Sequence, residues 1–336
     1  MDLELEQRVL DIERKIEVER KITKLEQVYG LKGMFMRLEQ RISRLELFYA
    51  CSNGIFREVQ QLLRNPCLDL NYRDENGCTP FYIACYKGYS DVVELLIQDE
   101  RVDVNQPNVS GQTPLWIALR YGRNEVLQVL LNDERIDFNQ ADYKDGETPF
   151  WIACDRGEFP LAKFLLDEKG VDPNESNNGG RTPFWDACYW GSMNAVKFLL
   201  EDRRVDVNKA DSQNRTPLFA ACQLGQIDVV EYLLASKRKI KIKVRDYRGN
   251  KAIDIAREKR DEDFDDFSDE DEEVLQIRNQ KYNEIIELLT LYERNPSETR
   301  SDLRKRFGLD GNTFLILFIF LFISPFFFAL WSFFYF

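Results

Sequence analysis

The hydrophobic and polar positions of this chain repeat with a period of about 34 residues. The heptapeptide Thr79-Pro-Phe-Tyr-Ile-Ala-Cys85 returns in similar form at Thr113, Thr148, Thr182 and Thr216, at steps of 34, 35, 34 and 34 residues. In each copy the threonine can cap free N–H groups at the start of a helix, and the proline fits the first helical position, which needs no donor. The period therefore predicts stacked helical repeats, because one unit of this length cannot bury its own apolar face.

Three positions are the same in all six repeats that this register defines. An alanine five residues after each start allows close helix packing, and a glycine nine residues after it can end the first helix in a left-handed conformation. A leucine seventeen residues after the start lies in the apolar stripe of a second helix. The repeats cover residues 45–250 and start at Leu45, Thr79, Thr113, Thr148, Thr182 and Thr216.

These features together resemble ankyrin repeats. The resemblance includes the Thr-Pro heptapeptide, the helix-ending glycine, the second-helix sequence Val92–Leu96, and the Val-Asp-Val-Asn sequences at 102–105 and 205–208. It implies an all-α fold, an ankyrin-repeat solenoid with two antiparallel helices and a hairpin loop per repeat. It also implies that the stacked repeats bind proteins on a concave face.

One departure from the family is systematic. Ankyrin repeats usually carry His at the fourth heptapeptide position, and this chain has aromatic residues there. We expect these rings to be buried wedges rather than a ligand-binding ladder, because repeats ~8–10 Å apart hold ring centroids beyond the ~4.5–7 Å of direct aromatic pairing. The six rings belong to Phe48, Tyr82, Trp116, Trp151, Trp185 and Phe219.

Residues 1–44 are predicted to form an amphipathic, coiled-coil-like helical segment. Apolar residues follow a spacing of four and three from Leu5 to Ile16, and again from Val28 to Tyr49. Two short blocks of this kind fit a coiled coil between two copies of the chain, which would make the protein a homo-oligomer. They fit equally well a helix that covers the open end of the repeat stack. The pattern favours neither interpretation.

The segment after the repeats is predicted to combine a degenerate repeat with an acidic insertion. Residues 251–295 form the capping repeat, residues 261–273 its inserted acidic loop, and residues 296–312 a polar linker. Ten of the carboxylates behind the formal net charge of −12 lie in this loop, with no Lys or Arg among them, which leaves −2 for the rest of the chain. The acidity is therefore local, and it argues against binding to nucleic acid.

Residues 313–336 are predicted to be a C-terminal hydrophobic helix that anchors the protein in a membrane. Phe314–Phe336 contains ten Phe, four Leu and three Ile and carries no charge. A helix of this length, at ~1.5 Å per residue, spans the ~30 Å hydrocarbon core, and the preceding Arg304–Arg306 suits a cytosolic flank. The expected localisation is a single-pass C-terminal anchor with the repeats in the cytosol. The alternative is a soluble cytoplasmic protein whose tail is spurious or buried.

The composition offers little for catalysis or cofactor binding. The chain has no histidine, which excludes Ser-His-Asp triads, Cys-His pairs, histidine metal sites and a His general base. It has no Walker loop and no dinucleotide-binding glycine motif. Five of its seven cysteines share one repeat position, and repeats ~8–10 Å apart cannot bridge them. We therefore expect reduced thiols, no cofactor, no metal and no enzyme.

The function expected from these observations is protein binding by an adaptor or scaffold. By resemblance to the family, the two residues before each helix-ending glycine face the concave side. Tyr, Trp and Arg, which are enriched at binding hot spots, concentrate there in repeats two to five. The partners expected are a protein and, through Phe314–Phe336, a lipid bilayer. The candidate partner-binding residues are Tyr86, Lys87, Arg120, Tyr121, Asp155, Arg156, Tyr189, Trp190, Gln223 and Leu224.

Overall fold

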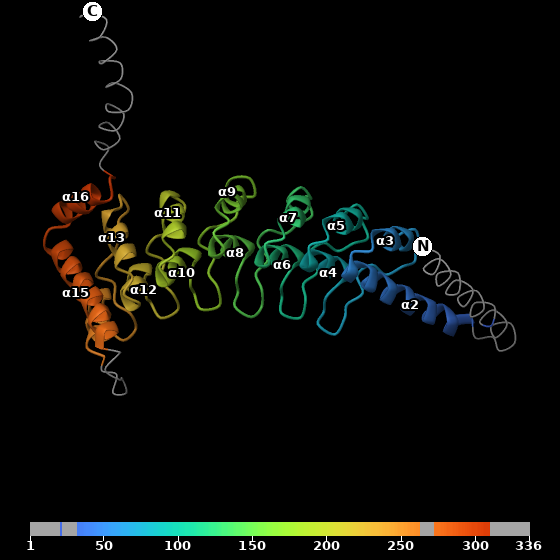
Figure 1. Ribbon diagram of the computed structural model, residues 1–336, viewed down its shortest axis with the longest axis horizontal. Coiled ribbons are helices and arrows are strands. Elements are labelled where there is room, and N and C mark those ends of the chain that lie inside the picture. Colours follow the sequence, from blue (N-terminus) through green and yellow to red (C-terminus); the bar gives the residue numbers. More distant parts are fainter. Residues whose placement is uncertain (1–20, 22–31, 263–271, 310–336) are drawn as a thin grey trace, which may run out of the picture. The chain divides into compact units, whose positions relative to one another are not determined.

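The computed structural model describes residue 21 and residues 32–262 and 272–309. These residues contain fifteen helices, α2 to α16, and no strand (Figure 1). The chain divides into two compact units, Met1–Tyr143 and Lys144–Phe336, here called the N-terminal unit and the C-terminal unit. The all-α fold of helix pairs and hairpin loops agrees with the prediction.

The N-terminal unit contains three helix pairs. The first helices of the pairs, α2, α4 and α6, pack side by side, and the second helices, α3, α5 and α7, form a row behind them. The bounds are α2 Lys32–Asn53, α3 Phe56–Leu62, α4 Pro80–Lys87, α5 Ser90–Ile97, α6 Pro114–Arg120 and α7 Asn124–Leu131.

The C-terminal unit contains three further pairs and a group of three helices after them. The first helices α8, α10, α12 and α14 pack in sequence, while α15 packs on α13 and α14, and α16 packs on α13 and α15. The bounds are α8 Pro149–Asp155, α9 Phe159–Asp167, α10 Pro183–Trp190, α11 Met193–Glu201, α12 Pro217–Gln223, α13 Ile227–Ala235, α14 Ala252–Arg260, α15 Glu272–Arg294 and α16 Pro296–Arg306.

The Thr-Pro heptapeptide starts the first helices as the sequence predicts. The Thr79 hydroxyl accepts a hydrogen bond from the backbone N–H of Tyr82 at 3.1 Å, and the other four threonines cap their helices in the same way. At the other end of α4, Gly88 has a φ of 89°, which a residue with a Cβ rarely adopts. Capping at both ends therefore fixes where each short helix begins and ends.

The hairpin loops are closed by side chains of Asp or Asn. In the loop before α4, the Asp74 carboxylate accepts hydrogen bonds from the backbone N–H groups of Asn76 and Cys78. Neighbouring loops are also linked directly, since the N–H of Val109 donates to the carbonyl of Asn76. The loops are thus ordered by local turn chemistry and by the loop of the next repeat.

The core contains the repeated alanines, five of the six repeated leucines, and most of the aromatic rings at the fourth heptapeptide position. Five of the six rings are buried and Phe48 is half-buried, which confirms that they fill space between the helices. The buried rings belong to Tyr82, Trp116, Trp151, Trp185 and Phe219.

The N-terminal helix differs from its predicted boundaries. Helix α2 runs unbroken through Leu45, where the first repeat was expected to start, so the first helix of that repeat is the C-terminal part of α2. Leu47 and Ala50 are buried, whereas the apolar stripe at Leu38, Ile42, Leu45 and Tyr49 is exposed. These four residues therefore do not cover the end of the N-terminal unit. The remainder of the predicted coiled-coil segment, apart from Lys21, precedes the described part of α2.

The predicted polar linker is largely helical. Residues 296–312 were predicted to be a polar linker, and within this range Pro296–Arg306 form α16. This helix is held by the buried side chain of Leu303 and by an ion pair between Arg306 and Glu231 of α13. The sequence did not indicate this helix because a single buried leucine leaves almost no apolar periodicity.

Two other predictions fall largely on residues outside the described ones. Residues 263–271, most of the predicted acidic loop, are among them, and so is the predicted membrane anchor at 313–336. Within the described residues, none of the helices has the length and apolar character needed to span a bilayer.

Candidate functional site

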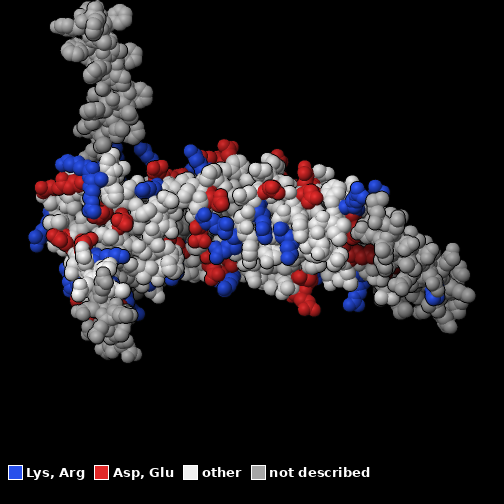
Figure 2. Space-filling view, in the orientation of Figure 1, with Lys and Arg blue, Asp and Glu red and all other residues white. Residues whose placement is uncertain are grey.

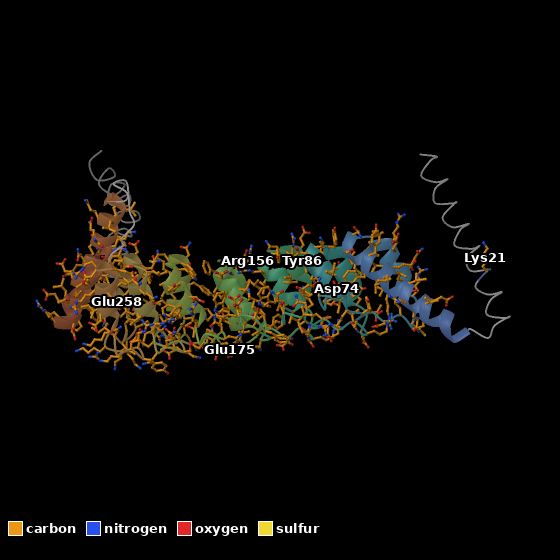
Figure 3. The ribbon with its side chains drawn as sticks, turned by 90° about the horizontal axis from the view of Figure 1, so that it is seen from below. Lys21, Asp74, Tyr86, Arg156, Glu175 and Glu258 are labelled. Atoms are coloured by element: carbon orange, nitrogen blue, oxygen red, sulfur yellow. The ribbon has the colours of Figure 1, made fainter. Side chains whose placement is uncertain are left out.

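In the N-terminal unit, the predicted binding residues lie at the ends of α4 and α6. The rings of Tyr86 and Tyr121 meet edge to face, with centroids 4.9 Å apart and planes at 85°. The Lys87 ammonium lies 5.5 Å from the centroid of the Tyr86 ring, and the Tyr86 carbonyl accepts a 2.9 Å hydrogen bond from Nε of Arg123. Tyr86, labelled in Figure 3, is half-buried, while Tyr121 and Arg120 are exposed. The predicted residues therefore form a small aromatic patch with basic neighbours.

In the C-terminal unit, the same positions of α10 carry a larger aromatic cluster. Trp185 and Tyr189 stack with ring centroids 5.2 Å apart, and Tyr189 meets Trp190 edge to face at 4.9 Å. Trp190 keeps 63% of its surface exposed. The buried Trp185 thus supports two rings that reach the surface.

Two arginines flank the buried ring of this cluster. The guanidinium carbons of Arg181 and Arg215 lie 4.8 and 5.4 Å from the centroid of a Trp185 ring, within the range of cation–π attraction. Nε1 of Trp185 donates a 2.8 Å hydrogen bond to the Arg215 carbonyl. These contacts hold Trp185, and through it the surface rings, in a defined orientation.

The last predicted pair, at the end of α12, contributes less. The side-chain amide oxygen of Gln223 accepts a 3.3 Å hydrogen bond from Arg215. The backbone carbonyl of Gln223 accepts one from the hydroxyl of Tyr282 at 3.0 Å. Leu224 is exposed. Gln223 is therefore largely engaged in holding α15 against α12, and only Leu224 adds apolar surface.

A small cavity lies between α8 and α10, beside the aromatic cluster. Its volume is about 20 Å³, counted as the space open to the centre of a water-sized group. Its lining residues include Trp151, Trp190, Asp155 and Asp186. Two of the predicted residues, Asp155 and Trp190, are thus brought together at one site. Arg156 is exposed and does not line the cavity.

Asp186 is a candidate functional residue that the sequence reasoning missed. Only 7% of its surface is exposed, and its Oδ1 has no hydrogen-bond partner among the described residues. Burial raises the pKa of its carboxyl to about 6, with the guanidinium of Arg181, 3.9 Å from Oδ1, acting in the opposite direction and Asp155 adding to the rise. The sequence did contain a signal for this residue. Asp186 occupies the fifth position of its heptapeptide, which is Ile in three of the other Thr-Pro copies and Ala in the fourth.

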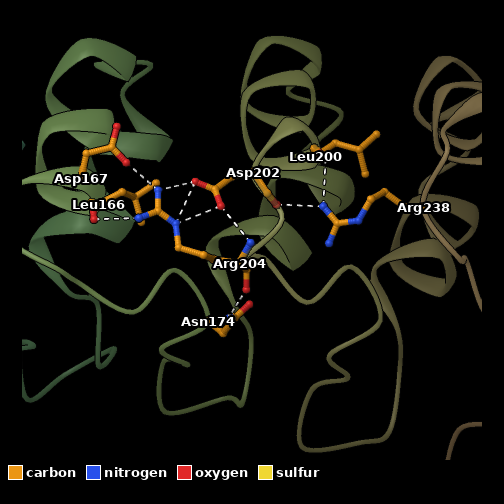
Figure 4. A network of polar contacts seen from close by, with 7 residues as sticks. All are labelled: Leu166, Asp167, Asn174, Leu200, Asp202, Arg204 and Arg238. Atoms are coloured by element: carbon orange, nitrogen blue, oxygen red, sulfur yellow. Dashed lines mark hydrogen bonds and ion pairs between the residues drawn. The ribbon is translucent and has the colours of Figure 1, made fainter.

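The side of the repeats away from the first-helix ends is occupied by structural contacts. Figure 4 shows one such network, in which Arg204 donates to the Leu166 carbonyl at 2.9 Å and to Asp167 at 2.7 Å. Arg204 also donates to Asp202 and thereby lowers the pKa of that carboxyl. Asn174 donates to the Arg204 carbonyl at 2.8 Å. Because these groups bond across consecutive repeats, they stabilise the stack and leave few polar atoms for a ligand.

The cysteines and carboxylates of the described residues provide no further candidate site. All seven cysteines are free, and burial raises the pKa of the Cys51 and Cys78 thiols to about 12, which makes them poor nucleophiles. The described residues contain no group of three or more Cys, Asp or Glu side chains arranged to hold a metal ion. Acidic and basic side chains are mixed on the face shown in Figure 2.

The fold and the site define a protein built of stacked helix pairs that displays aromatic side chains at the ends of its first helices. A family model described as ankyrin repeats in three copies matches residues 47–142 and 136–211, and a model of the single ankyrin repeat matches residues 213–247. The matches cover more than half of the chain. The protein therefore belongs to the ankyrin-repeat family, whose repeats serve protein–protein interaction.

Solved structures share the fold at low sequence identity. The ankyrin repeat domain of Bcl-3, described as a unique member of the IkappaB protein family, is 21% identical with a TM-score of 0.56, and the match covers 62% of this chain and 92% of that one. A chain from the complex of the endopeptidase Bd0816 of Bdellovibrio bacteriovorus with the immunity protein Bd3460 is 24% identical with a TM-score of 0.51. That match covers 57% of this chain and 98% of the other. A comparison with curated proteins found no match.

Proposed function

We propose that this protein is an adaptor that binds another protein at the ends of its first helices. The observation that carries the proposal is the aromatic cluster on α10, where Trp190 is largely exposed beside the packed rings of Tyr189 and Trp185. Trp, Tyr and Arg side chains supported in this way are typical of binding hot spots. The stability of the helix does not require an exposed indole at its last residue, whereas an interface would bury it.

The cluster is also preorganised for binding. Trp185 is held by a hydrogen bond and two guanidinium groups, and it fixes Tyr189 by stacking. Side chains that are already ordered lose little conformational entropy when a partner covers them. Burial of these rings by a partner can therefore favour binding with little loss of side-chain entropy.

The similar structures support a protein as the partner. One belongs to a member of the IkappaB protein family, and another comes from a complex between an endopeptidase and an immunity protein.

We further propose that the adaptor is tethered to a membrane by Phe314–Phe336, with the repeats in the cytosol. This proposal rests on the length and composition of that segment alone. A soluble cytoplasmic adaptor is the alternative. The absence of enzymatic activity likewise stays a prediction from the sequence.

The binding face is tested by affinity capture with paired variants. Two double variants each remove one aromatic patch: Tyr189→Ala/Trp190→Ala the patch on α10, and Tyr86→Ala/Tyr121→Ala the patch on α4 and α6. The control is Tyr247→Ala, because the Tyr247 side chain is 80% exposed on a hairpin loop. We expect the first variant to lose the proteins captured by the parent, the second to lose fewer, and the control to retain them. Loss of capture only in the control would place the interface on the hairpin loops instead.

The tether is tested by fractionation. The full chain should remain with membranes after alkaline carbonate extraction, whereas a chain ending at residue 311 should be extracted. If both chains are extracted, the soluble adaptor is the correct alternative.

A further inference from the structure

The cavity beside Trp190 has the size and lining of a site for one small polar group. Its volume of about 20 Å³ slightly exceeds the ~10–15 Å³ that one water needs. Trp151, Ala187, Asp155 and Asp186 are among its lining residues, and the indole Nε1 of Trp151 has no hydrogen-bond partner among the described residues. All of these residues belong to α8 and α10 of the C-terminal unit, so the site is complete within that unit.

Asp186 distinguishes this cavity from the equivalent positions in the other repeats. The heptapeptide has Ile117 and Ile152 at this position, and both are buried. Asp186 instead places a carboxylate in the same buried location, where its Oδ1 has no hydrogen-bond partner among the residues that the structure describes. A buried carboxylate in this condition disfavours folding unless something binds to it.

The cation closest to Asp186 satisfies it only in part. Nη1 of Arg181 is 3.9 Å from Oδ1, which is beyond hydrogen-bond distance. The same guanidinium lies over the ring of Trp185 at 4.8 Å and near that of Tyr189 at 5.8 Å. Arg181 is thus placed mainly by the aromatic cluster, and it leaves Oδ1 of Asp186, an atom closed to bulk solvent, without a hydrogen bond.

We propose, building on the function proposed above, that this cavity receives the primary ammonium group of a lysine side chain of the partner protein. An ammonium group is about the size of a water molecule, carries the charge that two carboxylates attract, and has three donors for their oxygens. The methylene stem of a lysine can lie along an exposed ring such as that of Trp190. A trimethylammonium group, or the planar guanidinium of arginine, is larger than the available space.

The inference can be tested with a small probe on the full-length protein. Nα-acetyl-lysine amide is titrated into protein that contains 5-fluorotryptophan, and the ¹⁹F signals of its indoles are followed by NMR. We expect Trp151 and Trp190 to shift with saturation. Trp116, which does not line this cavity, should not shift and serves as an internal control.

Two further probes and two variants make the test specific. Nα-acetyl-norleucine amide lacks the charge, and the Nε-trimethylated lysine amide is too large, so neither should bind at the same concentration. Asp186→Asn keeps the size of the side chain and should raise the half-saturating concentration of the lysine probe at least tenfold. Asp155→Asn, at the exposed position, should raise it only about twofold. Equal binding of the norleucine or trimethyl probe, or unchanged binding to Asp186→Asn, would overturn the inference.

The outcome is separable from that of the proposed function. If Trp190→Ala abolishes partner capture while the parent does not bind the lysine probe, the adaptor function stands and the lysine site is wrong. If the lysine probe binds at Trp151 and Trp190 but capture does not depend on the aromatic patches, the site stands and the proposed interface is wrong.

Discussion

The two units use the same positions of the repeat to build different surfaces. In the N-terminal unit, the fifth heptapeptide position of α6 is the buried Ile117, and Tyr86 and Tyr121 meet edge to face. In the C-terminal unit, Asp186 replaces the isoleucine, and a cavity lies beside the exposed ring of Trp190. The backbone, the caps and the neighbouring alanine are shared. Departures from the repeat's own pattern therefore indicate function more directly than the pattern itself, which reports the fold.

The largest effect should follow from transferring the aspartate to the other unit. Ile117→Asp places a carboxylate at a position where the side chain is 5% exposed, which we expect to reduce the free energy of unfolding by about 3–5 kcal/mol. Urea unfolding measures this loss. Ile117→Asn, which is polar but uncharged, should lose less. A loss below ~1 kcal/mol for Ile117→Asp would mean that the two positions are equivalent, contrary to the comparison.

A pH-dependent effect should be confined to the C-terminal unit. The pKa of Asp186 is raised in the folded state to about 6 from an ordinary value of 3.8, so its ionisation destabilises the fold. The parent should therefore lose stability relative to Asp186→Asn as the pH rises from about 4 to 7, by about 3 kcal/mol at most for a shift of this size.

Several charged groups influence this titration. Arg181 and Asp155 act on Asp186 in opposite directions and are present in both proteins, so the comparison isolates the one carboxyl. Unfolding free energies of the two proteins at pH 4 and pH 7 give the result. A constant difference across this range would show that Asp186 titrates normally.

A smaller difference is expected between the structural arginines of the two units. Both arginines pair with the aspartate two residues earlier and donate to a carbonyl of the preceding repeat, that of Leu166 for Arg204 and that of Ile97 for Arg135. Arg204 also pairs with Asp167. Replacement of either arginine by Ala should cost about 1–2 kcal/mol. The cost should be larger for Arg204 by up to ~1 kcal/mol because of its additional partner. Thermal melting measures the stability of the two variants. A lower melting temperature for Arg135→Ala than for Arg204→Ala would contradict the prediction.

The smallest effect on stability should come from the exposed rings. Trp190→Ala and Tyr121→Ala remove side chains that are 63% and 49% exposed, so each should change the free energy of unfolding by no more than about 0.5 kcal/mol. If the variants are as stable as the parent protein, a loss of partner binding can be attributed to the missing contacts of the ring with the partner. A loss above ~2 kcal/mol would assign these rings to the core instead.

The sequence predicted the parts of the fold that are encoded locally. The Thr cap, the Pro after it and the glycine at the helix end act within one turn, so their recurrence defined the helix pairs. Helix α16 could not be predicted in this way because it depends on packing against α13 through Leu303 and Arg306. The role of Arg204 could not be predicted either, because it donates a hydrogen bond to the Leu166 carbonyl in the preceding repeat.

The candidate site was predicted only in part for a related reason. The residues before the helix-ending glycines were indicated by position, and Tyr86, Tyr121, Tyr189 and Trp190 do gather into aromatic patches. The role of Asp186 depends on its burial next to α8, which the sequence does not report. Its chemical difference from isoleucine was visible, but its environment was not.

If Phe314–Phe336 anchors the protein as proposed, the contacts of α16 limit how far the C-terminal unit can be from the bilayer. A fully extended linker at residues 296–312 would span up to about 60 Å, whereas the stretch between Arg306 and Phe314 spans at most about 25 Å. Since Arg306 is paired with Glu231, that shorter stretch begins at the surface of the C-terminal unit itself. With Phe314–Phe336 in a bilayer, the unit would be held within a few nanometres of the lipid. The partner would then be bound close to the bilayer surface.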